Sequence, residues 1–184
     1  MKREISSDKF PMGTQLPQFS LKGVRGSSFD SGSTPIDKGL LIVFTCNHCP
    51  YVKGSEAELM QVARRYGTEG LKTVTINSND PIKYPEDNFE KMEERAKNLG
   101  LPYPYLFDAT QEVARLFDAA CTPESYLFDK NRTLVYHGAI NDNPKDSGAA
   151  KQFHLRQAVE QLLSGKAVNP AFVHPFGCSI KWRT

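Results

Sequence analysis

Apolar residues in this chain gather in short runs that are separated by polar, turn-rich stretches. The longest run, Gly39 to Thr45, is apolar at every inner position and predicts a strand that is buried on both faces. Further strands are predicted at 71–77, 105–107, 124–129 and 134–138, the last two forming a hairpin. Helices are predicted at 51–66, 87–99, 110–118 and 149–163, with Asp87 as the cap of the second.

The two ends of the chain are less regular. Residues 1–38 are rich in Gly, Ser and Pro, and predict a loop-like lead-in with an edge strand or small hairpin at Leu16–Leu21. The tail is expected to pack on the domain because it keeps four apolar residues: Phe176, Cys178, Ile180 and Trp182. Strand–helix–strand units followed by a hairpin and a closing helix predict an α/β fold. We expect one domain over residues 1–184, with a central mixed sheet and helices on both faces.

Composition narrows the function. The chain has 184 residues and a formal charge of +2, which suits one domain with an ample core and indicates no nucleic-acid partner or membrane surface. No apolar run approaches a membrane span, and Met1–Lys9 lacks the apolar core of a secretory signal. We therefore expect a cytoplasmic protein. Four cysteines do not make a disulfide scaffold here, and a close pair in a reducing compartment is more often catalytic or metal-binding.

The segment Cys46-Asn-His-Cys49-Pro50 carries the candidate chemistry. It follows the buried strand and opens a helix, so both sulfurs lie on a first helical turn and can form a disulfide. Free amides at a helix N-terminus stabilise a thiolate, and protonated His48 adds positive charge. We expect Cys46, at the exposed helix start, to have a pKa below the ordinary value of about 8.5. Structural zinc fits less well because Cys121 and Cys178 form no second ligand pair, and no metal ligand is assigned.

The chain resembles the thioredoxin superfamily and, within it, the AhpC/TSA peroxiredoxin-like branch of thiol-disulfide oxidoreductases. The resemblance rests on the strand, Cys-x-x-Cys and helix order and on the stretches Ile76–Asp80, Asp108–Ala114, Thr122-Pro123 and Gly177–Trp182. It covers roughly residues 10–184. It implies a thioredoxin-like fold with an N-terminal extension, and an antioxidant role linked to a redox-active disulfide. Cys46 would be the attacking thiol, Cys49 the resolving thiol and Pro123 a cis-proline facing the pair.

The resemblance also implies roles for neighbouring residues. Thr45 and Thr122 would contact the substrate. Cys121 and Cys178 are accessory redox candidates. Simple packing in the core is the alternative for each, and for Cys178 it is the stronger interpretation. A disulfide between the two cysteines also stays open. His48 stands where related oxidoreductases have the histidine of Cys-Pro-His-Cys and Cys-Gly-His-Cys, which makes the disulfide easier to reduce.

Three differences from the family patterns bear on function. Thioredoxin has Trp where this chain has Thr45, and its buried acid in the preceding strand has no counterpart here. Peroxiredoxins hold peroxide with a Thr-x-x-Cys motif and a distant Arg. Cys46 stands where that Thr would be, and Cys121 near the place of the Arg. Peroxidase activity is therefore expected to be slow unless Arg115 or Arg132 folds into the site.

Three functions follow as hypotheses. The leading one is a thiol-disulfide oxidoreductase that reduces or exchanges protein or small-molecule disulfides, needs no cofactor and is regenerated by a thioredoxin-type electron donor. The first alternative is a peroxiredoxin-like thiol peroxidase. The second is a copper- or metal-binding thioredoxin-fold protein similar to Sco-like proteins, with Cys46, Cys49 and a histidine as ligands. The remaining histidines, His137, His154 and His174, are expected to be structural or exposed.

Overall fold

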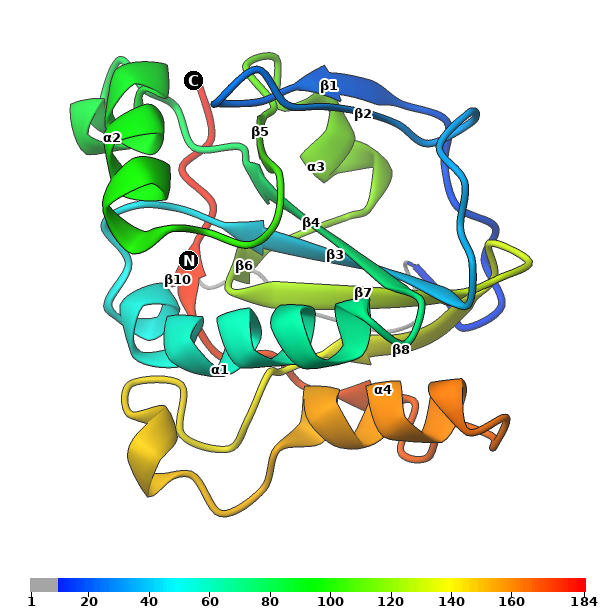
Figure 1. Cartoon of the computed structure of the whole chain (residues 1–184). Helices are drawn as coiled ribbons and strands as arrows, with labels where there is room; N and C mark the ends of the chain where they lie inside the picture. The colour runs from blue at the N-terminus through cyan, green and yellow to red at the C-terminus, as the bar shows by residue number, and fades with distance from the viewer. Residues whose placement is uncertain (1–9) are drawn as a thin grey trace.

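The computed structural model describes residues 10–184 (Figure 1), so residues 1–9 of the expected lead-in lie outside the described residues. A six-stranded mixed sheet forms its centre, with the strand order β5-β4-β3-β7-β8-β9. Its strands are β3 (Gly39–Thr45), β4 (Leu71–Asn77), β5 (Tyr105–Phe107), β7 (Glu124–Asp129), β8 (Leu134–Gly138) and β9 (Phe172–Val173). β3, β4 and β5 are parallel, β7 is antiparallel to both β3 and β8, and β9 is parallel to β8.

Helices cover both faces of this sheet, as the sequence predicts. They are α1 (Pro50–Gly67), α2 (Phe89–Leu99), α3 (Glu112–Leu116) and α4 (His154–Leu163), with short 3-10 turns η1 (Pro85–Asp87) and η2 (Ser147–Ala149). α1, α2 and α4 pack on one face, and α3 packs on the other beside the N-terminal hairpin of β1 (Ser20–Lys22) and β2 (Ser28–Asp30). Within residues 10–184, no helix has both the length and the apolar character needed to cross a bilayer.

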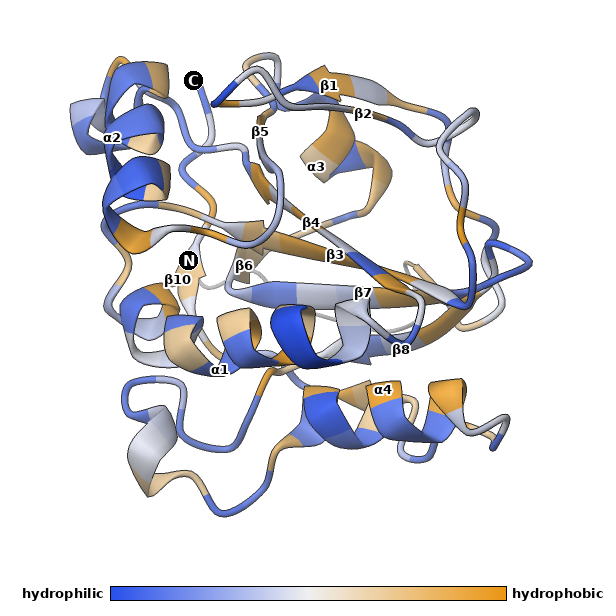
Figure 2. Ribbon diagram, viewed as in Figure 1, coloured by the Kyte–Doolittle hydropathy of each residue, from blue (hydrophilic) through white to orange (hydrophobic). Residues whose placement is uncertain are grey.

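The predicted central strand β3 is buried along its whole length. Leu41 and Val43 face the core under α1, whereas Leu40, Ile42 and Phe44 face the core on the side of α3. This alternation is the two-residue period of a strand, and it explains why the run is apolar on both faces. In Figure 2, β3 is largely in hydrophobic colours, whereas α1 mixes both. Each buried Leu or Ile contributes about 1.5–3 kcal/mol, so this strand anchors the site that follows it.

Several element boundaries differ from the sequence predictions. The second helix begins at Phe89, because the Asn88 side chain caps it by accepting the Lys91 amide at 2.8 Å. The expected cap, Asp87, instead turns a buried carboxylate toward the cysteine pair. The third and fourth helices are shorter than predicted, since a 3-10 turn stands where the last helix was expected to begin. The N-terminal hairpin lies a few residues after the predicted position.

A two-residue ladder holds the tail against the centre of the molecule. β6 (Cys121–Thr122) pairs antiparallel with β10 (Cys178–Ser179). The buried Ile180 belongs to the core on the α3 side, so the tail packs on the domain as its apolar content predicts. The ladder adjoins the carboxyl end of β3, where α1 begins. Open α/β sheets place their sites at this edge.

Candidate active site

The Cys46–Cys49 segment connects β3 to α1, with Pro50 as the first residue of the helix. Both thiols are free, and they are only 1% and 0% exposed. The peptide bond between Thr122 and Pro123 is cis, as the resemblance implies. The Thr122 hydroxyl lies 3.4 Å from Cys46 Sγ, and the Cys49 thiol donates to the Thr122 carbonyl at 3.3 Å. The cis-proline loop therefore faces the pair, but the expected exposure of Cys46 is wrong.

The negative charge of the reduced pair is favoured on Cys49. A hydrogen bond from the Cys46 thiol is the main cause that lowers the pKa of Cys49, to about 4. The Cys178 thiol and the amides of Val52 and Cys178 also donate to this sulfur, while burial opposes them. The nearby Thr122 carbonyl accepts only from the protonated thiol, so it too opposes ionisation. The donors outnumber that single acceptor, which is why we assign the thiolate to Cys49.

Cys46 is held in its neutral form. The hydrogen bond to Cys49, burial and the negative charge of Asp87 all raise the pKa of Cys46, and only the Thr122 hydroxyl lowers it. The expectation that Cys46 is the more acidic thiol is therefore wrong. The helix N-terminus lowers the pKa of a thiol, but its Val52 amide reaches the second sulfur and not the first.

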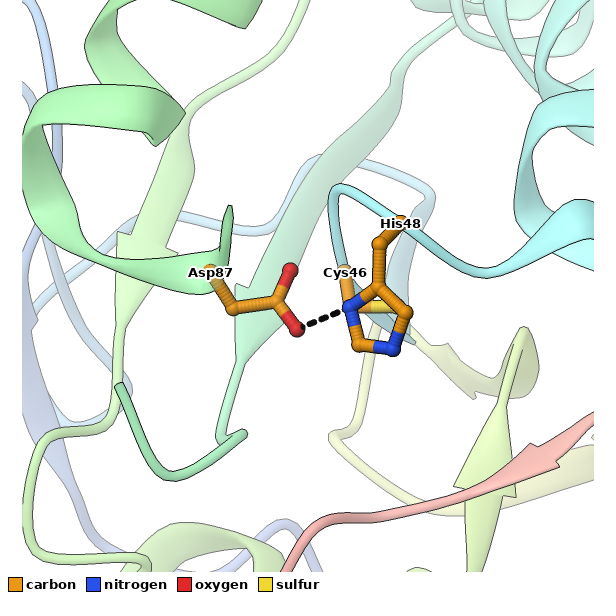
Figure 3. A group of neighbouring side chains, drawn as sticks. All are labelled: Cys46, His48 and Asp87. Atoms are coloured by element: carbon orange, nitrogen blue, oxygen red, sulfur yellow. Dashed lines mark ion pairs between the residues drawn. The ribbon is translucent and has the colours of Figure 1, made fainter. Parts of the chain in front are cut away.

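Asp87 supplies the buried acid that β3 lacks (Figure 3). Its carboxylate accepts the Asn47 amide at 2.6 Å and the Asn79 side chain at 2.7 Å. His48 Nδ1 lies 2.6 Å from the same carboxylate, an ion pair when the ring is protonated, although the two groups are not aligned for a hydrogen bond. The His48 ring stacks on Tyr84 with centroids 5.7 Å apart. Any positive charge on His48 is thus partly offset by Asp87.

Three side chains here could also hold a metal ion. Cys46, His48 and Asp87 each offer one donor atom, and these atoms all lie within 4.8 Å of one another (Figure 3). Sulfur and imidazole nitrogen suit soft cations such as Cu(I) or zinc. Asp87 already accepts two hydrogen bonds, so a metal ion would compete with the contacts that order the loop.

A second buried acid stands behind the cis-proline. One oxygen of Glu124 accepts the amides of Ala120 and Cys121 at 2.8 and 3.0 Å, which fixes the loop. The other lies 2.7 Å from His137 Nε2 and accepts the Tyr126 hydroxyl at 2.9 Å. His137 is therefore buried and structural. Apart from the position of Glu124 directly after Pro123, no local signal in the sequence marks this network.

The two accessory cysteines occupy different surroundings. Cys121 is buried, and burial followed by the negative charge of Glu124 raises its pKa, so it is a poor nucleophile. Cys178 is half-buried and packs against the pair. In the ladder Cys178 pairs with Thr122, and Ser179 pairs with Cys121. Because side chains alternate along a strand, Cys121 and Cys178 point to opposite faces, which does not favour a disulfide between them.

The remaining expected site residues lie at the pair but are covered. Thr45, Cys46 and Pro123 line a cavity of about 10 Å³, about enough for one water. An ion pair of 2.5 Å between Arg95 and Glu56 lies in the same lining. The Thr122 backbone is paired with β10. Any molecule larger than water can therefore reach the pair only after a local movement.

Neither arginine named as a substitute for the peroxidase Arg is engaged at the pair. Arg115 packs over the Trp182 ring, 4.6 Å from its centroid. Arg132 donates to the carbonyls of Ser31 and Thr34 on the N-terminal segment. Both side chains have structural partners away from the pair, and slow peroxide turnover stays a prediction.

A buried Cys-x-x-Cys pair at a helix start, opposite a cis-proline, defines a thiol protein of thioredoxin-like fold. Residues 12–137 match the model of the AhpC/TSA family, and the chain belongs to that family. It is thus a member of a group of thiol-disulfide oxidoreductases and peroxiredoxin-like proteins.

Several solved structures share this fold. An uncharacterised conserved protein from Geobacillus kaustophilus is 42% identical with a TM-score of 0.89, covering 95% of this chain and 93% of that one. A hypothetical protein from Sinorhizobium meliloti 1021 is 37% identical with a TM-score of 0.88, covering 99% and 97%. A secreted disulfide oxidoreductase from Mycobacterium tuberculosis, homologous to DsbE, shares the fold alone: 20% identity, TM-score 0.54, covering 64% and 80%. No protein with a curated description matches the sequence.

Proposed function

We propose that this protein is a thiol-disulfide oxidoreductase that uses Cys46 and Cys49 to reduce or exchange disulfides of proteins or small molecules. The observation that carries the proposal is that both sulfurs lie against Thr122, at 3.4 Å from its hydroxyl and 3.3 Å from its carbonyl oxygen, opposite the cis peptide bond before Pro123. A thiol pair that shares one proton at neutral pH can both attack a disulfide and resolve the product. A thioredoxin-type dithiol protein would restore the reduced pair, and no cofactor is needed.

The catalytic cycle starts with one proton on the pair. Cys46 attacks a substrate disulfide as its proton passes along the hydrogen bond to Cys49, giving a mixed disulfide and a substrate thiolate. Cys49 then loses that proton and attacks Cys46 Sγ. The second substrate thiolate leaves, and a Cys46–Cys49 disulfide remains. The substrate gains two electrons and the protein loses two. Cys46 is the better-placed attacking thiol because it lines the cavity, whereas Cys178 covers Cys49.

Serine substitutions test these roles. We expect Cys46→Ser to lose disulfide reduction, and Cys49→Ser to accumulate a mixed disulfide with substrate, because the second attack is missing. Insulin reduction and mass spectrometry of the trapped adduct measure the two outcomes. If Cys46→Ser keeps most of the activity, or if Cys49 alone traps substrate, the assigned roles are reversed.

A thiol peroxidase is the second candidate, and the acidity of Cys49 favours it. The pKa of Cys49, lowered to about 4, makes this sulfur a thiolate at neutral pH, as peroxide attack requires. It also stands at the position of the peroxiredoxin cysteine in the Thr-x-x-Cys motif. We rank this function second because losing a polarising donor costs on the order of 10²–10³ in rate. Stopped-flow oxidation of the reduced protein by hydrogen peroxide distinguishes the two: a rate far above that of a free thiolate would place peroxidase first.

A further inference from the structure

Cys178 is the one cysteine of the four that is partly exposed. Its side chain packs against the buried cluster of Cys46, Cys49 and Val52. The β6–β10 ladder holds it there, with Cys178 opposite Thr122. Cys49 Sγ lies 3.3 Å from the carbonyl of that same Thr122. A third sulfur therefore stands beside the redox pair, on its solvent side.

The close fit of the tail depends on Gly177. A Cβ at this position would lie 2.0 Å from the Thr122 carbonyl oxygen, so no larger residue fits without a shift of the backbone. Further along, the Ile180 amide donates to the Ala120 carbonyl at 3.0 Å. The tail thus lies along the cis-proline loop as an added strand, which is a general way of recognising extended peptides. Cys178 thus reaches the redox pair from the position of an added strand.

We propose that Cys178 is a third redox-active thiol, which exchanges with the Cys46–Cys49 disulfide and presents a Cys49–Cys178 disulfide to a dithiol protein donor. This inference rests on the proposed function of the pair. The Cys178 thiolate attacks Cys49 Sγ, the Cys49–Cys178 bond forms, and the Cys46–Cys49 bond breaks. Cys46 leaves as a thiolate and takes up a proton. No electrons are gained or lost until the donor attacks Cys178, reduces the new disulfide and is itself oxidised.

The electrostatics of the site favour exchange only when the pair is oxidised. In the reduced protein the pKa of Cys178 is raised to about 11. Burial is the largest cause, followed by the hydrogen bond to Cys49 and the negative charge of Cys49, whereas the positive charges of Lys181 and Lys145 lower the pKa. Oxidation of the pair removes the Cys49 thiolate and both of its effects. Cys178 then becomes a stronger acid when a disulfide is present to attack. Cys46 also becomes a better leaving group, because its pKa is no longer raised by a hydrogen bond to that thiolate.

The surface next to Cys178 suits a protein donor. Phe176, two residues earlier, is 57% exposed and meets the Tyr51 ring edge-on with centroids 5.2 Å apart. The Lys145 ammonium group lies over the Tyr51 ring, 5.2 Å from its centroid. Exposed aromatic rings with a cationic rim are typical of protein interaction sites. A donor seated there would meet Cys178 before either cysteine of the pair.

Disulfide mapping tests the exchange directly. The Cys46→Ser protein is oxidised with diamide, which takes up the two electrons, and its peptides are analysed by mass spectrometry. We expect a Cys49–Cys178 disulfide, which Cys46→Ser/Cys178→Ser must lose and the matched control Cys46→Ser/Cys121→Ser must keep. Recovery of Cys49 and Cys178 as free thiols, or of Cys49 joined to Cys121, would overturn the proposal.

Disulfide mapping of the oxidised wild-type protein distinguishes a failure of this inference from a failure of the proposed function. If oxidised wild type contains neither a Cys46–Cys49 nor a Cys49–Cys178 disulfide, the proposed function fails. If it contains the Cys46–Cys49 disulfide and Cys46→Ser forms no Cys49–Cys178 bond, only the role of Cys178 fails. As a second readout, thioredoxin, its reductase and NADPH reduce the oxidised proteins. We expect Cys178→Ser to be reduced more slowly by about tenfold or more, and a smaller effect would show that the donor reaches the pair directly.

Discussion

At the scale of single residues, the position of one proton decides how the redox potential responds to pH. The pKa of Cys49 is lowered to about 4 and that of Cys46 is raised, so the reduced pair carries one proton near neutrality. Reduction of the disulfide then consumes two electrons and one proton. We expect the midpoint potential to fall by about 30 mV per pH unit, half the slope for two protons. Equilibration with dithiothreitol buffers measures this slope, and a value near 60 mV would show that both thiols are protonated.

The charges of Asp87 and His48 should act on Cys46 in opposite directions. The Asp87 carboxylate raises the pKa of Cys46, so Asp87→Asn should lower it. His48→Gln removes a side chain that forms an ion pair with Asp87 when it is protonated, and should raise the pKa of Cys46. The alkylation rate of Cys46 as a function of pH, followed by mass spectrometry, measures both shifts. Asp87→Asn/His48→Gln is the control, and it should lie between the single variants. Shifts of equal sign would contradict this electrostatic account.

The redox chemistry of this site could be predicted from the sequence, but the location of the negative charge within the site could not. Cys46 and Cys49 could be named as candidates because spacing and neighbouring elements are local features, whereas the cis-proline at Pro123 was implied by the family resemblance. The buried acids Asp87 and Glu124 could not, because they reach the site from other elements through long-range packing. For the same reason the sequence suggested the wrong sulfur as the thiolate: the donors from Cys178 become neighbours only when β10 pairs with β6.

At the scale of elements, the β6–β10 ladder depends on a glycine. Gly177→Ala would bring a Cβ within 2.0 Å of the Thr122 carbonyl oxygen and separate the tail from the cis-proline loop. Overpacking of this kind commonly costs about 1–3 kcal/mol. Gly67→Ala at the end of α1 is the matched control, because a Cβ there meets no atom within 4 Å. Urea unfolding should show a lower free energy of unfolding for Gly177→Ala alone. Equal stability of the two variants would mean that the ladder is not needed for folding.

Element prediction succeeded where periodicity is strong. The strands at 39–45 and 71–77 and the hairpin at 124–138 match β3, β4, β7 and β8, because each contains a run of apolar and β-branched residues long enough to mark a strand. The ladder between residues 121–122 and 178–179 has no such signal, since two residues cannot display a period. Only the apolar content of the tail indicated that it packs on the domain.

At the scale of the whole molecule, the pair couples redox state to stability. The site lies where the sheet edge, the start of α1 and the tail meet, so the reduced thiolate is stabilised only in the folded chain. An unfolded chain has no such donors, and its thiols ionise near the ordinary value of about 8.5. Folding therefore favours the reduced state, and by linkage the folded protein should hold a disulfide that is easily reduced. Of the two activities proposed, this direction favours disulfide exchange over net reduction.

The order of stability of the reduced and oxidised proteins, measured as the free energy of unfolding, should accordingly reverse as pH falls. The lowered pKa of Cys49 contributes stability that is complete above the unfolded pKa and is lost as pH falls toward 4. At pH 7 this contribution is on the order of 4 kcal/mol, whereas a disulfide closing so short a loop contributes about 2 kcal/mol. We expect the reduced protein to be the more stable form at pH 7 and the oxidised protein to be the more stable form near pH 4.5. Urea unfolding of both forms at the two pH values measures the difference, with Cys49→Ser as the reduced control that lacks the thiolate. A more stable oxidised form at pH 7 would contradict the assignment of the charge to Cys49.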